Sequence, residues 1–333
     1  MKKIILLINL VIAIVCNAYS QGTTSYGDYA ASTGEGNSFF GASTAYFNSN
    51  SSNYNTAIGA STLTFGGLGC TAIGYGSSYS NHYAYFQPPP FTGAIYNTAV
   101  GYRAMRENTD GDYNTGVGTE TLFKNKNNNN SALGYYALHE NNDGNNNSAM
   151  GVFSLYSNTS GIQNSAVGVR SLYANTSGQR NTAMGAYSLH SNLIGNYNTA
   201  MGYYASFNNN MGIQNTSNGY RALYNNTTGS YNTAQGAFAL QDSFGGNYNT
   251  AIGFNAGPVV DLLNNTTAIG YLANPTASNQ VRIGNTSVTS IGGEVEWTAF
   301  SDGRFKKDIK EDVSGLDFIN ELRPVSYTVD KVG

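Results

Sequence analysis

Polar and apolar residues recur along this chain in a fixed order. A core of the form Asn-Thr/Ser-Ala-apolar-Gly repeats through residues 37–273, and all eight intervals between its glycines from Gly134 to Gly270 are 17 residues long. Such constant spacing indicates a repeat architecture rather than an ordinary globular fold. The core glycines of the thirteen copies are Gly59, Gly74, Gly101, Gly118, Gly134, Gly151, Gly168, Gly185, Gly202, Gly219, Gly236, Gly253 and Gly270.

One unit, residues 181–197, shows what each copy contains. Its first six residues alternate as a strand does, with one face carrying Asn181, Ala183 and Gly185 and the other carrying Thr182, Met184 and Ala186. Residues 187–190 fit either a second short strand or a helical turn, although two strands per coil suit the length of the unit. A turn follows at Gly195, where we expect Asn and Gly because they tolerate positive φ.

Each unit is long enough for one coil of a β-solenoid, since about five residues in each of two strands leave room for two turns. Coils stacked roughly 4.8 Å apart would build a rod of about 60 Å, with like residues in columns of Asn, Ala and Gly. A coil this thin buries few apolar groups alone. We therefore expect an all-β, parallel β-solenoid or β-roll, with three chains sharing a core along the small Ala/Gly face.

The repeats resemble the heads of trimeric autotransporter adhesins, in which short Asn-Ser-x-Ala-Ile-Gly units form a left-handed parallel β-roll wound as a trimer. The resemblance covers about Asn37 to Ala273. It departs from that family in its period, because those heads usually repeat in shorter units. The resemblance implies a homotrimer.

An insertion over residues 77–95 interrupts the repeat, since 27 residues separate Gly74 from Gly101. It contains Pro88-Pro89-Pro90 and several aromatic residues. A loop that contacts a receptor or a glycan would explain it, and so would an insertion tolerated at a surface corner.

The N-terminus has the layout of a secretory signal peptide over residues 1–20. Lys2 and Lys3 precede an apolar run, and Ala18-Tyr19-Ser20 is a small-x-small cleavage site. We expect Gln21 to begin the mature chain, with residues 21–36 as a linker and no transmembrane segment after them. Lipid attachment at Cys16 is the alternative, although the preceding Val15 is bulky. Signal-peptide cleavage and lipid attachment both indicate a secreted, extracellular or cell-surface protein, associated with the outer membrane.

Composition excludes several classes of function. The net charge is −3 and only 11% of residues are charged, so no basic surface for nucleic acid is visible. The mature chain keeps one cysteine, Cys70, which leaves no intrachain disulfide. His82, His139 and His190 are scattered, and the latter two occupy a repeat position where Tyr or Phe is usual, so we interpret them as packing variants. No metal, cofactor or external substrate is expected.

The composition changes at the C-terminus, after a β-rich neck predicted over residues 274–300. Ser301, Asp302, Arg304, Phe305 and Lys306 form a Ser-Asp-x-Arg-apolar-Lys motif. The segment resembles the intramolecular chaperone of endosialidases, an autoproteolytic α+β domain that aligns three chains and then cuts itself off. We expect a short helix ending near Leu322 and a strand over residues 325–329, and the domain to be truncated at 301–333.

The resemblance implies that the bond between Phe300 and Ser301 is cut. Ser301 would be the nucleophile and Lys306 its partner, because a desolvated lysine can accept the serine proton. Any enzymatic activity would then be intramolecular. The alternative is that Ser301 and Asp302 cap a turn while Lys306 is solvated.

The leading hypothesis is a trimeric structural fibre that acts in adhesion, with a host-cell surface or a glycan as candidate partner. A phage-derived tail fibre is the runner-up, and the signal peptide argues against it. An ice- or surface-binding solenoid would use the Thr column, but an apolar residue follows each Thr two positions later.

Overall fold

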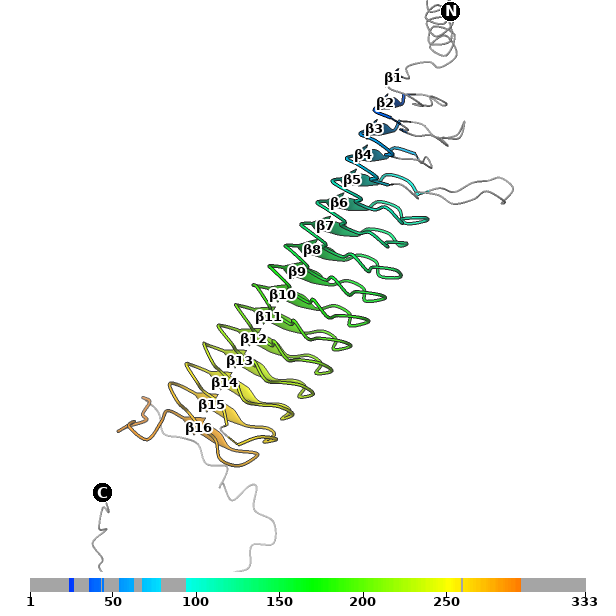
Figure 1. Cartoon of the computed structure of the whole chain (residues 1–333). Helices are drawn as coiled ribbons and strands as arrows, with labels where there is room; N and C mark the ends of the chain where they lie inside the picture. The colour runs from blue at the N-terminus through cyan, green and yellow to red at the C-terminus, as the bar shows by residue number, and fades with distance from the viewer. Residues whose placement is uncertain are drawn as a thin grey trace, which may run out of the picture. The chain divides into compact units, whose positions relative to one another are not determined.

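The computed structural model describes residues 24–26, 36–42, 44, 54–62, 68–78, 94–258 and 260–294. These residues form one parallel sheet of sixteen strands, in which the strands follow one another in sequence order from β1 to β16 (Figure 1). The described residues contain no helix. The prediction of an all-β, parallel β-solenoid is therefore confirmed.

Every strand is three residues long, and each coil contributes one. The strands are β1 Thr24–Tyr26, β2 Ser38–Phe40, β3 Thr56–Ile58, β4 Thr71–Ile73, β5 Thr98–Val100, β6 Thr115–Val117, β7 Ser131–Leu133, β8 Ser148–Met150, β9 Ser165–Val167, β10 Thr182–Met184, β11 Thr199–Met201, β12 Thr216–Asn218, β13 Thr233–Gln235, β14 Thr250–Ile252, β15 Thr267–Ile269 and β16 Val281–Ile283.

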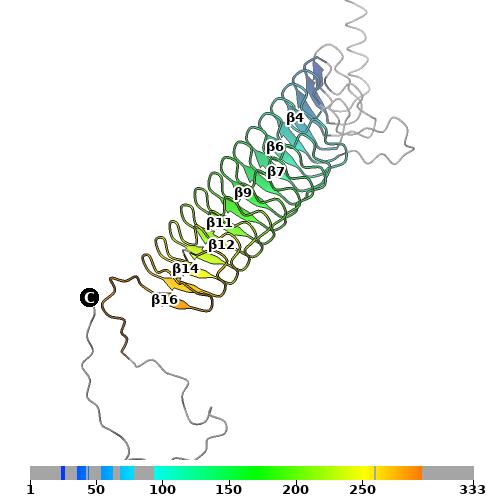
Figure 2. The ribbon, with the colours of Figure 1, turned by 60° about the horizontal axis from the view of Figure 1, so that its bottom comes forward.

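Equivalent residues of successive coils lie directly above one another. Between β10 and β11, for example, the paired residues are Thr182 with Thr199, Ala183 with Ala200 and Met184 with Met201. The coils form a regular stack when viewed from a second direction (Figure 2). The 17-residue period therefore sets the register of the sheet, as the sequence predicts. The sheet also continues beyond residue 273, because β16 pairs with β15.

The second half of each coil is neither the expected second strand nor a helical turn. In the unit 181–197, Gly185, Tyr187 and Leu189 all have positive φ, at 132°, 58° and 48°. Their N–H groups bond to the neighbouring coils: that of Tyr187 donates to the Val169 carbonyl of the preceding coil at 2.9 Å, and that of Leu189 to the Ala205 carbonyl of the following coil at 3.0 Å. These bonds between coils stabilise a backbone that L-residues rarely adopt.

The turn at Gly195 differs from its prediction as well. Positive φ falls on Tyr197 rather than on Gly195. The glycine is required there for space, because a Cβ at Gly195 would lie 2.5 Å from the Gly212 carbonyl oxygen of the next coil and would also overlap the side chain of Asn192. Close packing between coils therefore explains this glycine.

The core of the solenoid lies inside each coil, and this corrects the predicted role of the Ala/Gly face. Ala183 and its equivalents are 0–3% exposed, and so is the column that includes Leu189. Their small side chains fill a thin interior together, so the alanine face is closed within its own chain and is not available to another one. The apolar residue that follows each alanine points outward instead.

Two columns of buried asparagines complete the interior. The side chain of Asn181 accepts the Asn198 N–H at 3.0 Å and donates to the Gly195 carbonyl at 2.8 Å. The side chain of Asn192 donates to that of Asn175 at 2.9 Å. Buried amides are costly unless bonded, so these columns hold the coils in register as well as in contact.

Several predictions fall outside the described residues. They concern the signal peptide, the insertion loop over 79–93, and everything from residue 295 onward, which includes the Phe300–Ser301 bond, Lys306 and the helix and strand expected after them. The chain divides into two units, Met1–Ser287 and Val288–Gly333. No helix within the described ranges is long and apolar enough to cross a membrane.

Candidate functional site

The candidate functional surface is the outer face of the sheet. In β2–β15 the middle side chain is buried inside the coil, and the first and third point outward. The third residues form what we call the outer apolar row, which consists of Phe40, Ile58, Ile73, Val100, Val117, Leu133, Met150, Val167, Met184, Met201, Asn218, Gln235, Ile252, Ile269 and Ile283. Thirteen of these fifteen residues are apolar. Large apolar side chains therefore face solvent in almost every coil.

The first residues of the strands run beside this row. From Ser38 in β2 to Thr267 in β15 each is Ser or Thr, and we call them the hydroxyl row. Neither row contains an Asp, Glu, Lys, Arg or His over β2–β15. The face is therefore a long uncharged strip with a polar edge and an apolar edge.

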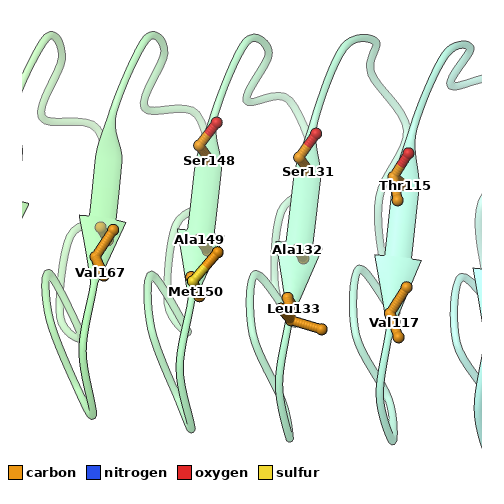
Figure 3. Close-up of a pocket in the computed structure, with 10 residues that line it drawn as sticks. Thr115, Val117, Ser131, Ala132, Leu133, Ser148, Ala149, Met150 and Val167 are labelled. Carbon is orange, nitrogen blue, oxygen red and sulfur yellow. The ribbon is translucent and has the colours of Figure 1, made fainter.

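A shallow hollow lies on this face over β6–β9, with a volume of about 310 Å³. Figure 3 shows the hydroxyl and apolar side chains projecting in parallel lines from successive strands. Met150 is 51% exposed there and Leu133 46%. The lining residues are Thr115, Val117, Ser131, Ala132, Leu133, Ser148, Ala149, Met150, Ala166 and Val167. None of them titrates near neutral pH, so this surface is suited to contact rather than to acid–base catalysis.

A column of stacked rings lies away from this strip, in the turn half of the coils. His139 stacks between Phe123 at 4.9 Å and Tyr156 at 5.3 Å, measured between ring centroids. His190 stacks between Tyr173 and Phe207, at 5.2 Å and 4.8 Å. Burial, followed by the charge of Arg170, lowers the pKa of His190. The prediction that these histidines are packing variants of an aromatic position is therefore confirmed.

The charged side chains of the middle coils pair with one another. His139 Nδ1 lies 2.8 Å from Glu140 Oε1, and its Nε2 lies 3.3 Å from Glu120 Oε2. Lys124 Nζ is 2.7 Å from Glu140. Burial raises the pKa of Glu140, but the hydrogen bonds from Lys124 and His139 outweigh it and hold the pKa below its usual value.

The same cluster affects a tyrosine and holds no metal site. A hydrogen bond to Glu120, with burial, raises the pKa of Tyr136 to about 12. Among the residues that the structure describes, no group of three or more His, Cys, Asp or Glu side chains is arranged to hold a metal ion. The pairs Lys124–Glu140 and His139–Glu120 join adjacent coils.

Alternation along the sequence predicts which residues share a face, but the alanine face that the prediction placed against other chains is buried inside the coil, and the outer apolar row is exposed. The candidate cleavage residues Phe300, Ser301 and Lys306 lie beyond the described ranges, so the structure does not bring them together or separate them. The signal for the outer row was present in the sequence, because the residue before the core glycine's position, the third of each strand, is apolar in thirteen of the fifteen strands β2–β16.

Comparison with known proteins gives one match. The family described as chaperone of endosialidase matches residues 301–332. The segment is thus similar to that chaperone over the residues that carry the Ser-Asp-x-Arg-apolar-Lys motif. No curated protein and no solved structure matches the chain.

Proposed function

We propose that this chain is the subunit of a secreted homotrimeric fibre, in which the solenoid is the shaft and the C-terminal segment assists assembly. The observation that carries the proposal is the outer apolar row, which leaves bulky apolar side chains exposed in most coils of the sheet. The match of residues 301–332 to the chaperone of endosialidase supports it. Solenoid and chaperone together fit a structural protein of the tail-fibre kind.

The dimensions of the strip support association. Both rows run through the fourteen strands from β2 to β15, which lie about 4.8 Å apart and give a strip roughly 60 Å long. A width of about 12 Å for the two rows yields an area of roughly 700 Å². Each partner in a stable complex buries about 800 Å². The strip is therefore of the size that a partner covers.

The periodicity of the strip favours a second copy as that partner. Side chains recur along it at the spacing of the strands, about 4.8 Å. A surface that fills every gap in such a row must have the same period, and another copy of the same stack has it. The absence of charge on both rows removes the repulsion that like copies would otherwise meet. Three copies around one axis would bring the three outer apolar rows together.

The C-terminal chemistry is part of the same proposal. Ser301 Oγ attacks the carbonyl carbon of Phe300 while Lys306 accepts the hydroxyl proton. The Phe300–Ser301 amide bond then breaks, its nitrogen takes that proton and becomes the amino group of Ser301, and an ester joins Phe300 to Ser301 Oγ. Water hydrolyses this ester, which leaves a carboxylate on Phe300, restores the Ser301 hydroxyl and releases the chaperone segment from the shaft. The adhesive role, with a host-cell surface or a glycan as ligand, rests on the secreted fibre architecture. A phage tail fibre is the alternative use of the same architecture.

The experiment compares the full chain with Ser301→Ala by light scattering coupled to gel filtration and by intact mass. We expect both to have three times the chain mass, and the parent alone to lose a C-terminal fragment that begins at Ser301. A single-chain mass in both would reject the fibre. Equal chain masses would reject self-cleavage alone. N-terminal sequencing of secreted protein should begin at Gln21.

A further inference from the structure

One strand breaks the apolar character of the solenoid on both of its faces. In β12 the inward alanine is replaced by Ser217, and the outward apolar residue by Asn218. In β13 the outward residue is Gln235. Asn218 and Gln235 are the two residues of the outer apolar row that are not apolar, and they lie in adjacent coils.

The hydroxyl of the inward Ser217 finds its hydrogen-bond partner within the same chain. Ser217 accepts a hydrogen bond from Ser206 at 2.9 Å, and Ser206 occupies the position that Leu189 and Leu223 hold in the neighbouring coils. The apolar core ends at Ala205 on one side of this pair and resumes at Ala222 on the other. The two serine hydroxyls thus bond to each other inside the coil, and neither requires a partner from another chain.

The outer amides are different. The asparagines of the interior bond to the next coil, as Asn198 does to Asn181. The side-chain amides of Asn218 and Gln235 are exposed, and no hydrogen bond joins either one to a described residue. Both amides therefore keep donors and acceptors free on a face where the other thirteen residues of the row are apolar.

This matters for the proposed trimer because a repetitive shaft has a register problem. Sliding one chain by a whole coil moves apolar residues onto other apolar residues, and Ser or Thr onto Ser or Thr, so most of the contact is unchanged. A feature that occurs once along the row removes this ambiguity. A polar residue at one position of an apolar seam is a known means of fixing the alignment of helices, and the physical reason does not depend on helices.

We propose that Asn218 and Gln235 fix the register of the shaft in the homotrimer, a proposal that rests on the proposed function. In register, three Asn218 amides meet at one level, and each donates to the next while it accepts from the previous one. Three Gln235 amides do the same one coil below. A slip of one chain by one coil keeps one amide pair, Asn218 against Gln235. It also places the second Asn218 against Met201 and the second Gln235 against Ile252, which leaves these two amides buried without partners.

The test uses two chains that are produced together as full-length protein and that each carry one introduced cysteine, Met150→Cys in one and Val167→Cys in the other. These residues occupy the same row in adjacent coils. After mild oxidation, mass spectrometry of unreduced peptides separates 150–150 and 167–167 links, which report the aligned register, from 150–167 links, which report a slip by one coil. Each chain has only one of the two cysteines, so every such link joins different chains.

We expect the aligned links to dominate in the parent background. In the background N218I/Q235I the trimer should persist, and the ratio of slipped to aligned links should rise by at least about fivefold, the factor that ~1 kcal/mol represents for one unsatisfied amide. The matched control M201I/I252M alters the neighbouring coils of the row without adding or removing an amide, and its ratio should remain that of the parent.

The outcomes separate the two proposals. A trimeric N218I/Q235I protein whose link ratio equals that of the parent would overturn the register proposal and leave the fibre intact. Trimers that form no link at residues 150 and 167 would also overturn it, because the outer apolar row would then lie away from the axis. A single-chain mass in the parent would reject the proposed function itself.

Discussion

The column of core glycines gives the sharpest prediction about stability. Gly185 has a φ of 132°, and a Cβ added to it would lie 2.6 Å from the carbonyl oxygen and 2.7 Å from the carbonyl carbon of Gly202 in the next coil. Those atoms belong to backbone, so the overlap is relieved only if the two coils move apart. The side chain in Gly185→Ala would therefore disturb the pairing of β10 with β11.

The magnitude follows from two separate costs. Backbone strain for an L-residue at such a φ is about 1–3 kcal/mol, and overpacking against rigid neighbours costs about 1–3 kcal/mol. We expect Gly185→Ala to lower the free energy of unfolding by about 2–6 kcal/mol. Gly292→Ala is the control, because no atom lies within 4 Å of its added Cβ, and a substitution of that kind usually changes stability by less than about 0.5 kcal/mol.

The assay is urea denaturation followed by circular dichroism, together with hydrogen exchange of peptides from residues 182–206. Exchange is needed because repeat proteins can open one region at a time. Gly185→Ala should lose amide protection in the coils of β10 and β11, while Gly292→Ala retains it. Equal stability and equal protection in the two variants would refute the argument that contact between glycine backbones joins the coils.

Three further predictions concern the interior and the charged cluster. Asn192→Ala removes the hydrogen bond to Asn175 and leaves the Asn209 amide, which donates to Asn192 at 2.8 Å, without that acceptor. Chemical denaturation should show that the free energy of unfolding falls by about 1–3 kcal/mol. Asn142→Ala, at a half-exposed position, should change the free energy of unfolding little. Leu189→Ala, at a fully buried site, should lower the free energy of unfolding by about 2–5 kcal/mol in the same assay. The pKa of Glu140 is held below its usual value of 4.5, so its contribution to stability is present above that pH and is lost as the pH falls through the folded-state pKa. Glu140→Gln should therefore reduce the difference between the urea midpoints at pH 7 and pH 3, and an unchanged difference would contradict the role of the cluster.

The sequence predicts the period and the columns of this fold better than it predicts the shape of one coil. Columns of Asn, Ala and Gly follow directly from the 17-residue spacing, and the structure stacks Ala183 on Ala200 as that spacing requires. Alternation shows which residues share a face, but it does not show which face is inside. Here the thin coil accepts the small alanines, and Met184 is left outside.

The backbone conformation of the turn half of the coil could not be predicted from local sequence preferences. Positive φ at Tyr187, Leu189 and Tyr197 contradicts the preferences of these residue types. Their conformation depends on hydrogen bonds to the coils on either side, and such bonds are a property of the stack. The role of Gly195 was misread for the same reason, because the atoms that exclude a Cβ there include the backbone of the next coil.

The central claim is that the outer face of the sheet joins the chains of the fibre. Sedimentation equilibrium of the full chain tests it when the triple variant L133E/M150E/V167E is compared with S160E/S177E/I194E, which places the same three charges on the turns of consecutive coils. We expect three chain masses for the parent and for the turn variant, and a folded single chain for the outer-face variant. A trimer that survives charges on the outer apolar row would contradict it.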